Sequence, residues 1–132
     1  MTTGKDLTRA TSQCVHFVRS AEVPALLAEL AATDLKVAEV GAAPITDKAE
    51  LMTQVSAALA FPGYVAANWD ALDEALRDLE WLPAPGYVLV VHNAGHLWHP
   101  DVQLGGSFTE VWLAAAESWA ATRTPYHLVF VT

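Results

Sequence analysis

The sequence predicts an α/β fold in which helices pack on a small parallel β-sheet. Short apolar segments rich in β-branched residues alternate with longer segments whose apolar residues recur at helical spacing. The most apolar segment, residues 87–91, lies between a Pro-Gly pair and Asn93, as expected for a strand covered on both faces. Strands that alternate with helices form mostly parallel sheets through right-handed crossovers. The predicted order is therefore β-α-β-α-α-β-α-β.

The first strand and the first helix are predicted within residues 13–34. Residues 14–18 are apolar and rich in β-formers, and the helix that follows has Ser20 as its predicted N-cap. Pro24 stands in the first turn of this helix, where proline is tolerated. The polar residues 1–12 are expected to form a loosely held tail.

The middle of the chain predicts a second strand and two further helices. Residues 35–40 form the strand, and the next helix begins at Asp47, with Glu50 three residues on as in a capping box. The Phe-Pro-Gly-Tyr sequence at residues 61–64 then separates this helix from another that runs from Asn68 to Leu79.

The C-terminal part predicts one more helix and one more strand. Residues 94–106 are expected to form a loop in which Gly105 and Gly106 lead into a helix from about Ser107. Trp112 and Trp119 are expected on the inner face of that helix. The last strand is predicted at residues 126–131.

Length and composition favour one compact domain, residues 1–132, over disorder. The chain has 132 residues, of which 53% are hydrophobic. It has one cysteine, which allows no intramolecular disulfide, and no secretory or membrane-spanning segment is apparent, so a cytoplasmic location is expected. Fifteen acidic against seven basic residues argue against direct binding to nucleic acid or an anionic membrane. A basic protein or a cationic ligand remains open as a partner.

The helix at residues 68–79 separates its side chains into two faces. At helical spacing, one face is apolar and contains Trp69, Leu72, Ala75, Leu76 and Leu79. The opposite face is charged and contains Asp70, Asp73, Glu74, Arg77 and Asp78. Like charges at this spacing repel, so helix stability does not explain the later carboxylates.

Two interpretations of this charged face are open. Most charged helix faces are simply solvated. Here, however, Tyr64 immediately precedes the acidic residues and Trp81 follows them. Aromatic residues beside an acidic patch are typical of protein-recognition surfaces.

The sequence Phe-Pro-Gly-Tyr-Val-Ala-Ala-Asn-Trp-Asp-Ala-Leu-Asp-Glu-Ala-Leu, at residues 61–76, resembles the signature of the barstar family. That family consists of intracellular inhibitors of secreted microbial ribonucleases. Its order of strands and helices fits the chain from about Leu35, and residues 13–34 would be an N-terminal extension that adds a strand and a helix. The resemblance implies a barstar-like fold and a 1:1 complex with a guanyl-type ribonuclease, with no enzymatic activity and no cofactor.

In such a complex, the loop and the acidic helix would fill the nuclease active site and replace the RNA phosphates. The resemblance assigns Tyr64 to the aromatic contact, Asn68 to the helix start and Asp70 to the first acidic contact. Glu74 matches the principal phosphate-mimicking aspartate, and Asp73 stands where the family often has an aromatic residue. A further acid on the later helix would be Glu117 or Glu110. The other predicted partner-binding residues are Val65, Ala66, Trp69, Arg77, Asp78 and Trp81.

Other kinds of chemistry are less well supported by the sequence. His92, His96 and His99 could ligate zinc, but they stand in a glycine-containing segment that imposes no common face, so no metal site is predicted. Asp70 and Glu74 lie one turn apart, yet a convex helix lacks the concave site that acid–base catalysis requires. The alternative to nuclease inhibition is a barstar-fold module that binds another basic protein.

Overall fold

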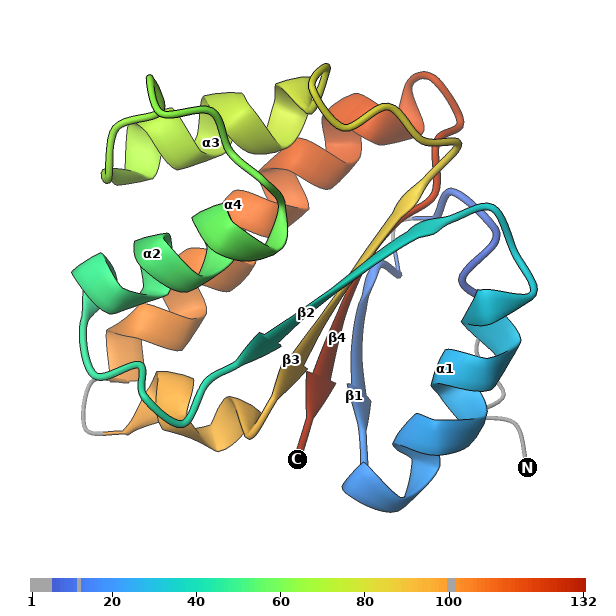
Figure 1. The fold of residues 1–132 in the computed structure, drawn as a ribbon, viewed down its shortest axis with the longest axis horizontal. Helices are drawn as coiled ribbons and strands as arrows, with labels where there is room; N and C mark the ends of the chain where they lie inside the picture. The colour runs from blue at the N-terminus through green and yellow to red at the C-terminus, as the bar shows by residue number, and fades with distance from the viewer. Residues whose placement is uncertain (1–5, 12, 100–101) are drawn as a thin grey trace.

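A computed structural model describes residues 6–11, 13–99 and 102–132. The helices and strands follow the predicted order, with two short 3-10 helices added (Figure 1). In chain order they are β1 (Val15–Val18), η1 (Ser20–Glu22), α1 (Val23–Ala31), β2 (Lys36–Gly41), α2 (Lys48–Ala58), α3 (Trp69–Asp78), β3 (Tyr87–His92), η2 (Ala94–Trp98), α4 (Val102–Ala120) and β4 (Tyr126–Val131).

The four strands form one parallel sheet, which confirms the predicted α/β fold. Their order is β1-β4-β3-β2, so the two C-terminal strands occupy the centre. Helix α1 covers one face of this sheet, and α2, α3 and α4 lie on the other (Figure 1). Among the described helices, none is long and apolar enough to cross a membrane.

Both faces of the central strands are buried, which explains why their sequences are almost entirely apolar. Along β3, Leu89 and Val91 belong to the cluster under α2, α3 and α4, whereas Val88 and Val90 belong to the cluster under α1. Successive side chains of a strand point to opposite faces, so a strand covered on both sides favours apolar residues at successive positions. Trp112 of α4 is fully buried in the larger cluster.

The segment before β1 packs on the sheet more closely than the sequence suggested. Residues 1–12 were expected to form a loose tail, and residues 1–5 and 12 lie outside the described residues. Leu7, however, is buried in the cluster under α1. The backbone carbonyl of Arg9 accepts a hydrogen bond from Nε2 of His127 on β4, at 2.7 Å.

The start of the first helix differs from the prediction. Ser20 does not cap it: Arg19 is the N-cap of η1, Ser20 is inside η1, and α1 begins at Val23. The Glu22 carboxylate accepts a hydrogen bond from the backbone N–H of Arg19 at 2.9 Å. This contact stabilises a tight 3-10 turn ahead of Pro24, whose ring favours the first turn of the following α-helix.

The predicted loop at residues 94–106 is largely helical, so this prediction was wrong. Residues 94–98 form η2, and α4 begins at Val102 instead of near Ser107, with both glycines inside it. Gly105 is required there because a Cβ atom at this position would overlap the indole ring of Trp98. Gly105 therefore lies inside α4 and allows close packing against Trp98, whereas the sequence suggested that it precedes the helix.

A pair of histidines joins β1 to β4 beneath the N-terminal segment. His127 is fully buried, and because a carbonyl can only accept, its Nε2 carries the proton donated to Arg9. Its Nδ1 therefore accepts from Nε2 of His16, at 2.9 Å. Burial lowers the pKa of His127, an effect opposed by its bond to Arg9 and by the nearby charge of Asp6.

We expect the free energy of unfolding to fall as the pH is lowered from 7.5 to 5.5. The pKa of His127 is lower in the folded chain than in the unfolded chain, so below a pH of about 6.5 the unfolded state binds the proton first. The stability present above that pH is lost as the pH falls towards the folded-state pKa. Urea titrations of the protein and of His127→Gln at both pH values measure this effect. An equally steep pH dependence in the variant would contradict the assignment to His127.

Candidate partner-binding surface

Asn68 fixes the start of α3, as the sequence predicted. Its backbone is extended, with φ −143° and ψ 165°, and its Oδ1 accepts a hydrogen bond from the backbone N–H of Ala71 at 2.7 Å. This geometry satisfies one of the backbone donors left free at a helix N-terminus. Asp70 lies in the first turn, where the helix dipole favours a negative charge.

Asn68→Ala is expected to lower the free energy of unfolding by about 1 kcal/mol, because it removes the side-chain cap. Asn68→Asp keeps an acceptor oxygen at the same place and should lose much less. Chemical denaturation of the two variants measures the difference. Equal losses of unfolding free energy in the two variants would show that Asn68 does not stabilise the helix through its side-chain cap.

The two faces of α3 are arranged as the sequence predicted. Leu72, Ala75 and Leu76 are buried, Trp69 is half-buried against the larger core cluster, and Leu79 is buried at the C-cap. On the outer side, Asp70, Glu74 and Asp78 are exposed. These three residues follow each other at i,i+4 spacing, and we call them the acidic row.

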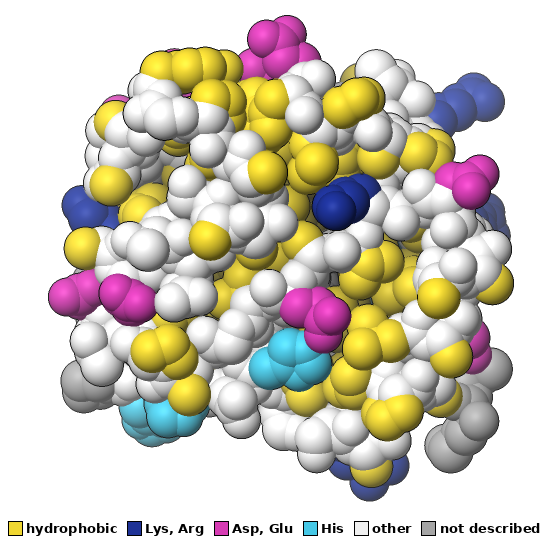
Figure 2. All heavy atoms as spheres, in the orientation of Figure 1, with side chains coloured by type: hydrophobic (Ala, Val, Ile, Leu, Met, Phe, Trp, Pro, Cys, Tyr) yellow, Lys and Arg dark blue, Asp and Glu magenta, His cyan; other side chains and the backbone are white. Residues whose placement is uncertain are grey.

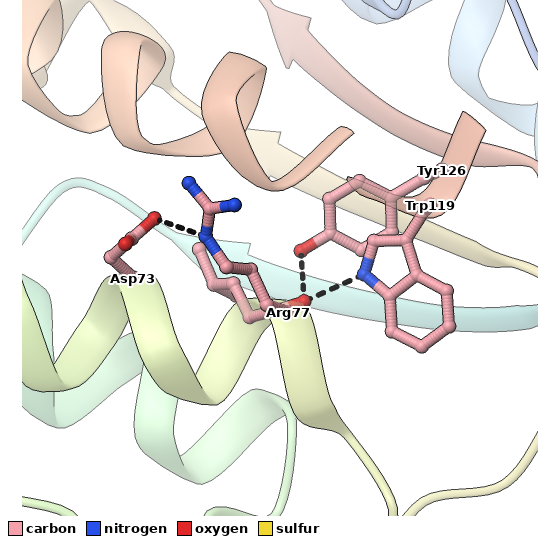
Figure 3. A network of polar contacts seen from close by, with 5 residues as sticks. Asp73, Arg77, Trp119 and Tyr126 are labelled. Carbon is pink, nitrogen blue, oxygen red and sulfur yellow. Dashed lines mark hydrogen bonds and ion pairs between the residues drawn. The ribbon is translucent and has the colours of Figure 1, made fainter. Parts of the chain in front are cut away.

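Asp73 and Arg77 form an ion pair along the edge of the charged face that lies nearer α4 (Figure 3). Nε of Arg77 donates to Oδ1 of Asp73 at 3.0 Å, and both side chains are only partly exposed. Figure 3 shows the pair on the side of α3 that faces α4. The pair contributes no net charge, so the uncompensated charge of α3 comes from the acidic row. Within the described residues, the members of that row form no ion pair.

A shallow groove of about 200 Å³ runs beside the acidic row. It brings together six of the residues predicted to bind a partner, namely Tyr64, Val65, Ala66, Glu74, Asp78 and Trp81. Tyr64 is 74% exposed, an unusual degree for a large aromatic side chain, and therefore offers its ring to a partner. The groove thus combines two carboxylates with two aromatic side chains.

Trp81 forms a rigid wall of this groove. Its Nε1 donates to the carbonyl of Leu59 at 3.1 Å, and its ring meets Phe61 edge to face, with centroids 5.7 Å apart. Both contacts come from the segment between α2 and α3. The aromatic residue that follows the acidic helix is therefore held in place before any partner arrives.

The other predicted residues lie outside the groove. Asn68 caps the helix, and Trp69 packs against the core. Asp70 lies in the first turn of α3, at the N-terminal end of the acidic row. Asp73 and Arg77 pair with each other. Glu117 and Glu110 are exposed on α4, and neither lines the groove.

The C-terminal end of α3 is fixed by contacts that sequence reasoning missed. The carbonyl of Leu76 accepts two hydrogen bonds, from Nε1 of Trp119 at 2.7 Å and from the hydroxyl of Tyr126 at 3.3 Å (Figure 3). Carbonyls in the last turn of a helix have no partner within the helix. A buried Trp or Tyr needs a hydrogen-bond partner for its polar atom. This requirement is the feature of the sequence that could have indicated such contacts. The two rings thereby tie α3 to α4 and β4.

The histidines that suggested a metal site do not come together. Nε2 of His92 lies 2.8 Å from Oε1 of Glu39, across the β2–β3 pair, whereas His96 and His99 line a separate crevice. In the described part of the chain, no three metal-binding side chains form a group. Acidic side chains on the face drawn in Figure 2 are scattered among neutral and hydrophobic surface.

Comparison with models of known protein families identifies the family of this chain. The family model described as Barstar (barnase inhibitor) matches residues 35–131, which begin just before β2 and end with β4. The match includes the groove and the acidic row and leaves out β1 and α1. No curated protein matches the chain. A family model that covers most of the chain is decisive, and the protein belongs to the barstar family, whose members are inhibitors of ribonuclease.

Proposed function

We propose that this protein is a 1:1 inhibitor of a secreted, guanyl-type microbial ribonuclease. It would act in the cytoplasm of the producing cell as an immunity protein, binding the nuclease without catalysing any reaction. The observation that carries the proposal is the acidic row beside a groove walled by Tyr64 and Trp81, in a chain that belongs to a family of ribonuclease inhibitors.

The chemistry of binding is the replacement of phosphates by carboxylates. Cationic side chains that hold an RNA phosphate also hold a carboxylate, through charge-assisted hydrogen bonds of similar geometry. On α3 the acidic row offers such groups at about 6 Å intervals, the rise of four helical residues. Helix α3 is fixed at both ends, by Asn68 and by the bonds to Leu76, so the row is held in place before binding.

Electrostatic attraction would also speed the encounter. The formal net charge is −8, and a nuclease that binds RNA presents a cationic groove. Complementary charges of this kind raise association rates to on the order of 10⁸ M⁻¹s⁻¹ at low salt. The complex of barnase with barstar is the standard example of electrostatic steering of association. The rate given above is therefore a known property of that related complex.

The test is an RNA-cleavage assay with a purified small guanyl-specific ribonuclease. Equimolar protein should abolish cleavage, with a titration that breaks at one inhibitor per enzyme. The same protein should leave an unrelated ribonuclease active. Full cleavage at equimolar or tenfold excess protein would reject the proposal. Binding to another basic protein under those conditions would then favour the interaction-module alternative.

A further inference from the structure

A crevice of about 480 Å³ lies at the end of the molecule where the strands finish. Its lining comes from three separate segments. Ser20 follows β1, the C-terminal end of β4 supplies Val131 and Thr132, and the chain after β3 supplies Asn93, Gly95, His96 and His99. Its volume is within the range of pockets that hold small ligands.

The crevice stands at the point where the connections of the sheet diverge. From β1 the chain turns to the face covered by α1, whereas from β3 it turns to the face covered by α4 (Figure 1). Strand β4 lies between these two strands. In open parallel sheets, ligands bind outside the carboxyl ends of the strands at such a divergence.

Five polar side chains line the crevice. The hydroxyl of Thr132 donates a hydrogen bond to the carbonyl of Val18, and the other four have no partner within the described residues. The side chains of Ser20, Asn93, His96 and His99 form no hydrogen bond or ion pair there. His96 lies in η2, and His99 follows as its C-cap with an extended backbone; both line the crevice. Asn93 has a φ of 56°, a left-handed conformation that turns the chain out of β3 at this point.

The lining offers hydrogen-bond donors to a ligand that accepts them, as an anion does. Each of these four side chains can donate a hydrogen bond, and the lining described contains no carboxylate side chain. A metal ion is disfavoured because no three metal-binding side chains gather among the residues described.

We propose that this crevice binds a small phosphate-bearing ligand. Its phosphate would be held by the imidazoles of His96 and His99, the amide of Asn93 and the hydroxyl of Ser20. Figure 1 places the ends of the strands at the bottom of the view and α3 at the top, so the crevice is remote from the acidic row. A bound ligand would leave the proposed nuclease-binding surface free.

The test is a titration of the ¹⁵N-labelled protein with three probes: ribose 5-phosphate, inorganic phosphate and ribose. Both phosphates should shift the amide signals of Ser20 and of residues 93–96 in a saturable manner, and ribose should not. Tighter binding of ribose 5-phosphate identifies a phosphate ester as the ligand, and equal binding identifies the free anion. The double variant His96→Gln/His99→Gln should lower phosphate affinity at least tenfold.

The matched control is His92→Gln, because His92 pairs with Glu39 and does not line the crevice. It should bind phosphate like the unmodified protein. Unfolding midpoints and nuclease inhibition measured on all three proteins show that the variants fold. Equal binding of ribose, unsaturable shifts, or unchanged phosphate affinity in the double variant would overturn the proposal. A Zn²⁺ titration that is abolished in the double variant, without any phosphate effect, would also overturn it.

Discussion

Glu74→Ala is expected to weaken nuclease binding by at least about 2 kcal/mol, which is roughly a thirtyfold rise in Kd. Glu74 is exposed, has no ion pair in the described structure and lines the groove beside Tyr64 and Trp81. In the complex its carboxylate would face cationic side chains of the nuclease. The substitution would leave those side chains without a partner in the interface. Asp70→Ala should have an effect of similar size. Calorimetric titration with the nuclease measures both.

The same substitution separates binding from stability. Alanine is a better helix former than glutamate, and Glu74→Ala relieves repulsion from Asp70 and Asp78 at i,i+4. The variant should therefore unfold at the same or a slightly higher denaturant concentration. An acidic residue that served only to stabilise the helix would behave in the opposite way.

Asp34→Ala is the matched control, since it removes one exposed carboxylate from the connection between α1 and β2. It changes net charge as Glu74→Ala does, yet it should alter Kd little. Asp101, which the sequence suggests for the same purpose, lies outside the described residues. Equal losses for Glu74, Asp70 and Asp34 would mean that net charge alone matters, and the proposed surface would be wrong.

Trp112→Ala is expected to lower the free energy of unfolding by about 3–5 kcal/mol. The side chain is fully buried, and its ring stacks on Tyr126 with centroids 4.2 Å apart and planes 15° apart. Removing it leaves a cavity between α4 and the sheet and takes away support from the tyrosine that holds Leu76. Urea unfolding followed by circular dichroism measures the loss.

Two variants sharpen this prediction. In the described structure Nε1 of Trp112 has no hydrogen-bond partner, so the residue contributes through packing, and Trp112→Phe should lose clearly less than alanine. Leu113→Ala, at the next position, removes a side chain that is 41% exposed and should cost far less than either. Comparable losses at positions 112 and 113 would contradict the assignment of Trp112 to the core.

The fold could be predicted where local pattern and tertiary packing agree. Residues 87–91 are apolar at every position and residues 126–131 at every position except His127, and both segments are central strands. The capping roles of Asp47 and Asn68 depend only on residues close to them in the sequence, and both caps are present. The start of α4 was missed because its reason is not local: Gly105 is within a helix to accommodate Trp98, which comes from another element.

The site was predictable at the level of one helix and not beyond it. Periodicity alone separates the acidic from the apolar face of α3, since both faces belong to one regular element. The Asp73–Arg77 pair has the i,i+4 spacing that would have revealed it, but the charged face was treated as a unit. The groove and the bonds to Leu76 depend on Trp81, Trp119 and Tyr126, which only the folded chain brings to α3.

The most direct measurement is a crystal structure of the equimolar complex with a guanyl-specific ribonuclease. The acidic row should lie over the nuclease active site, with the carboxylates of Asp70 and Glu74 within hydrogen-bond distance of Arg, Lys or His side chains that otherwise hold RNA phosphate. The ring of Tyr64 should contact the nuclease in the same interface. A complex formed through α1 or the free edge of β1, with α3 exposed to solvent, would contradict the account.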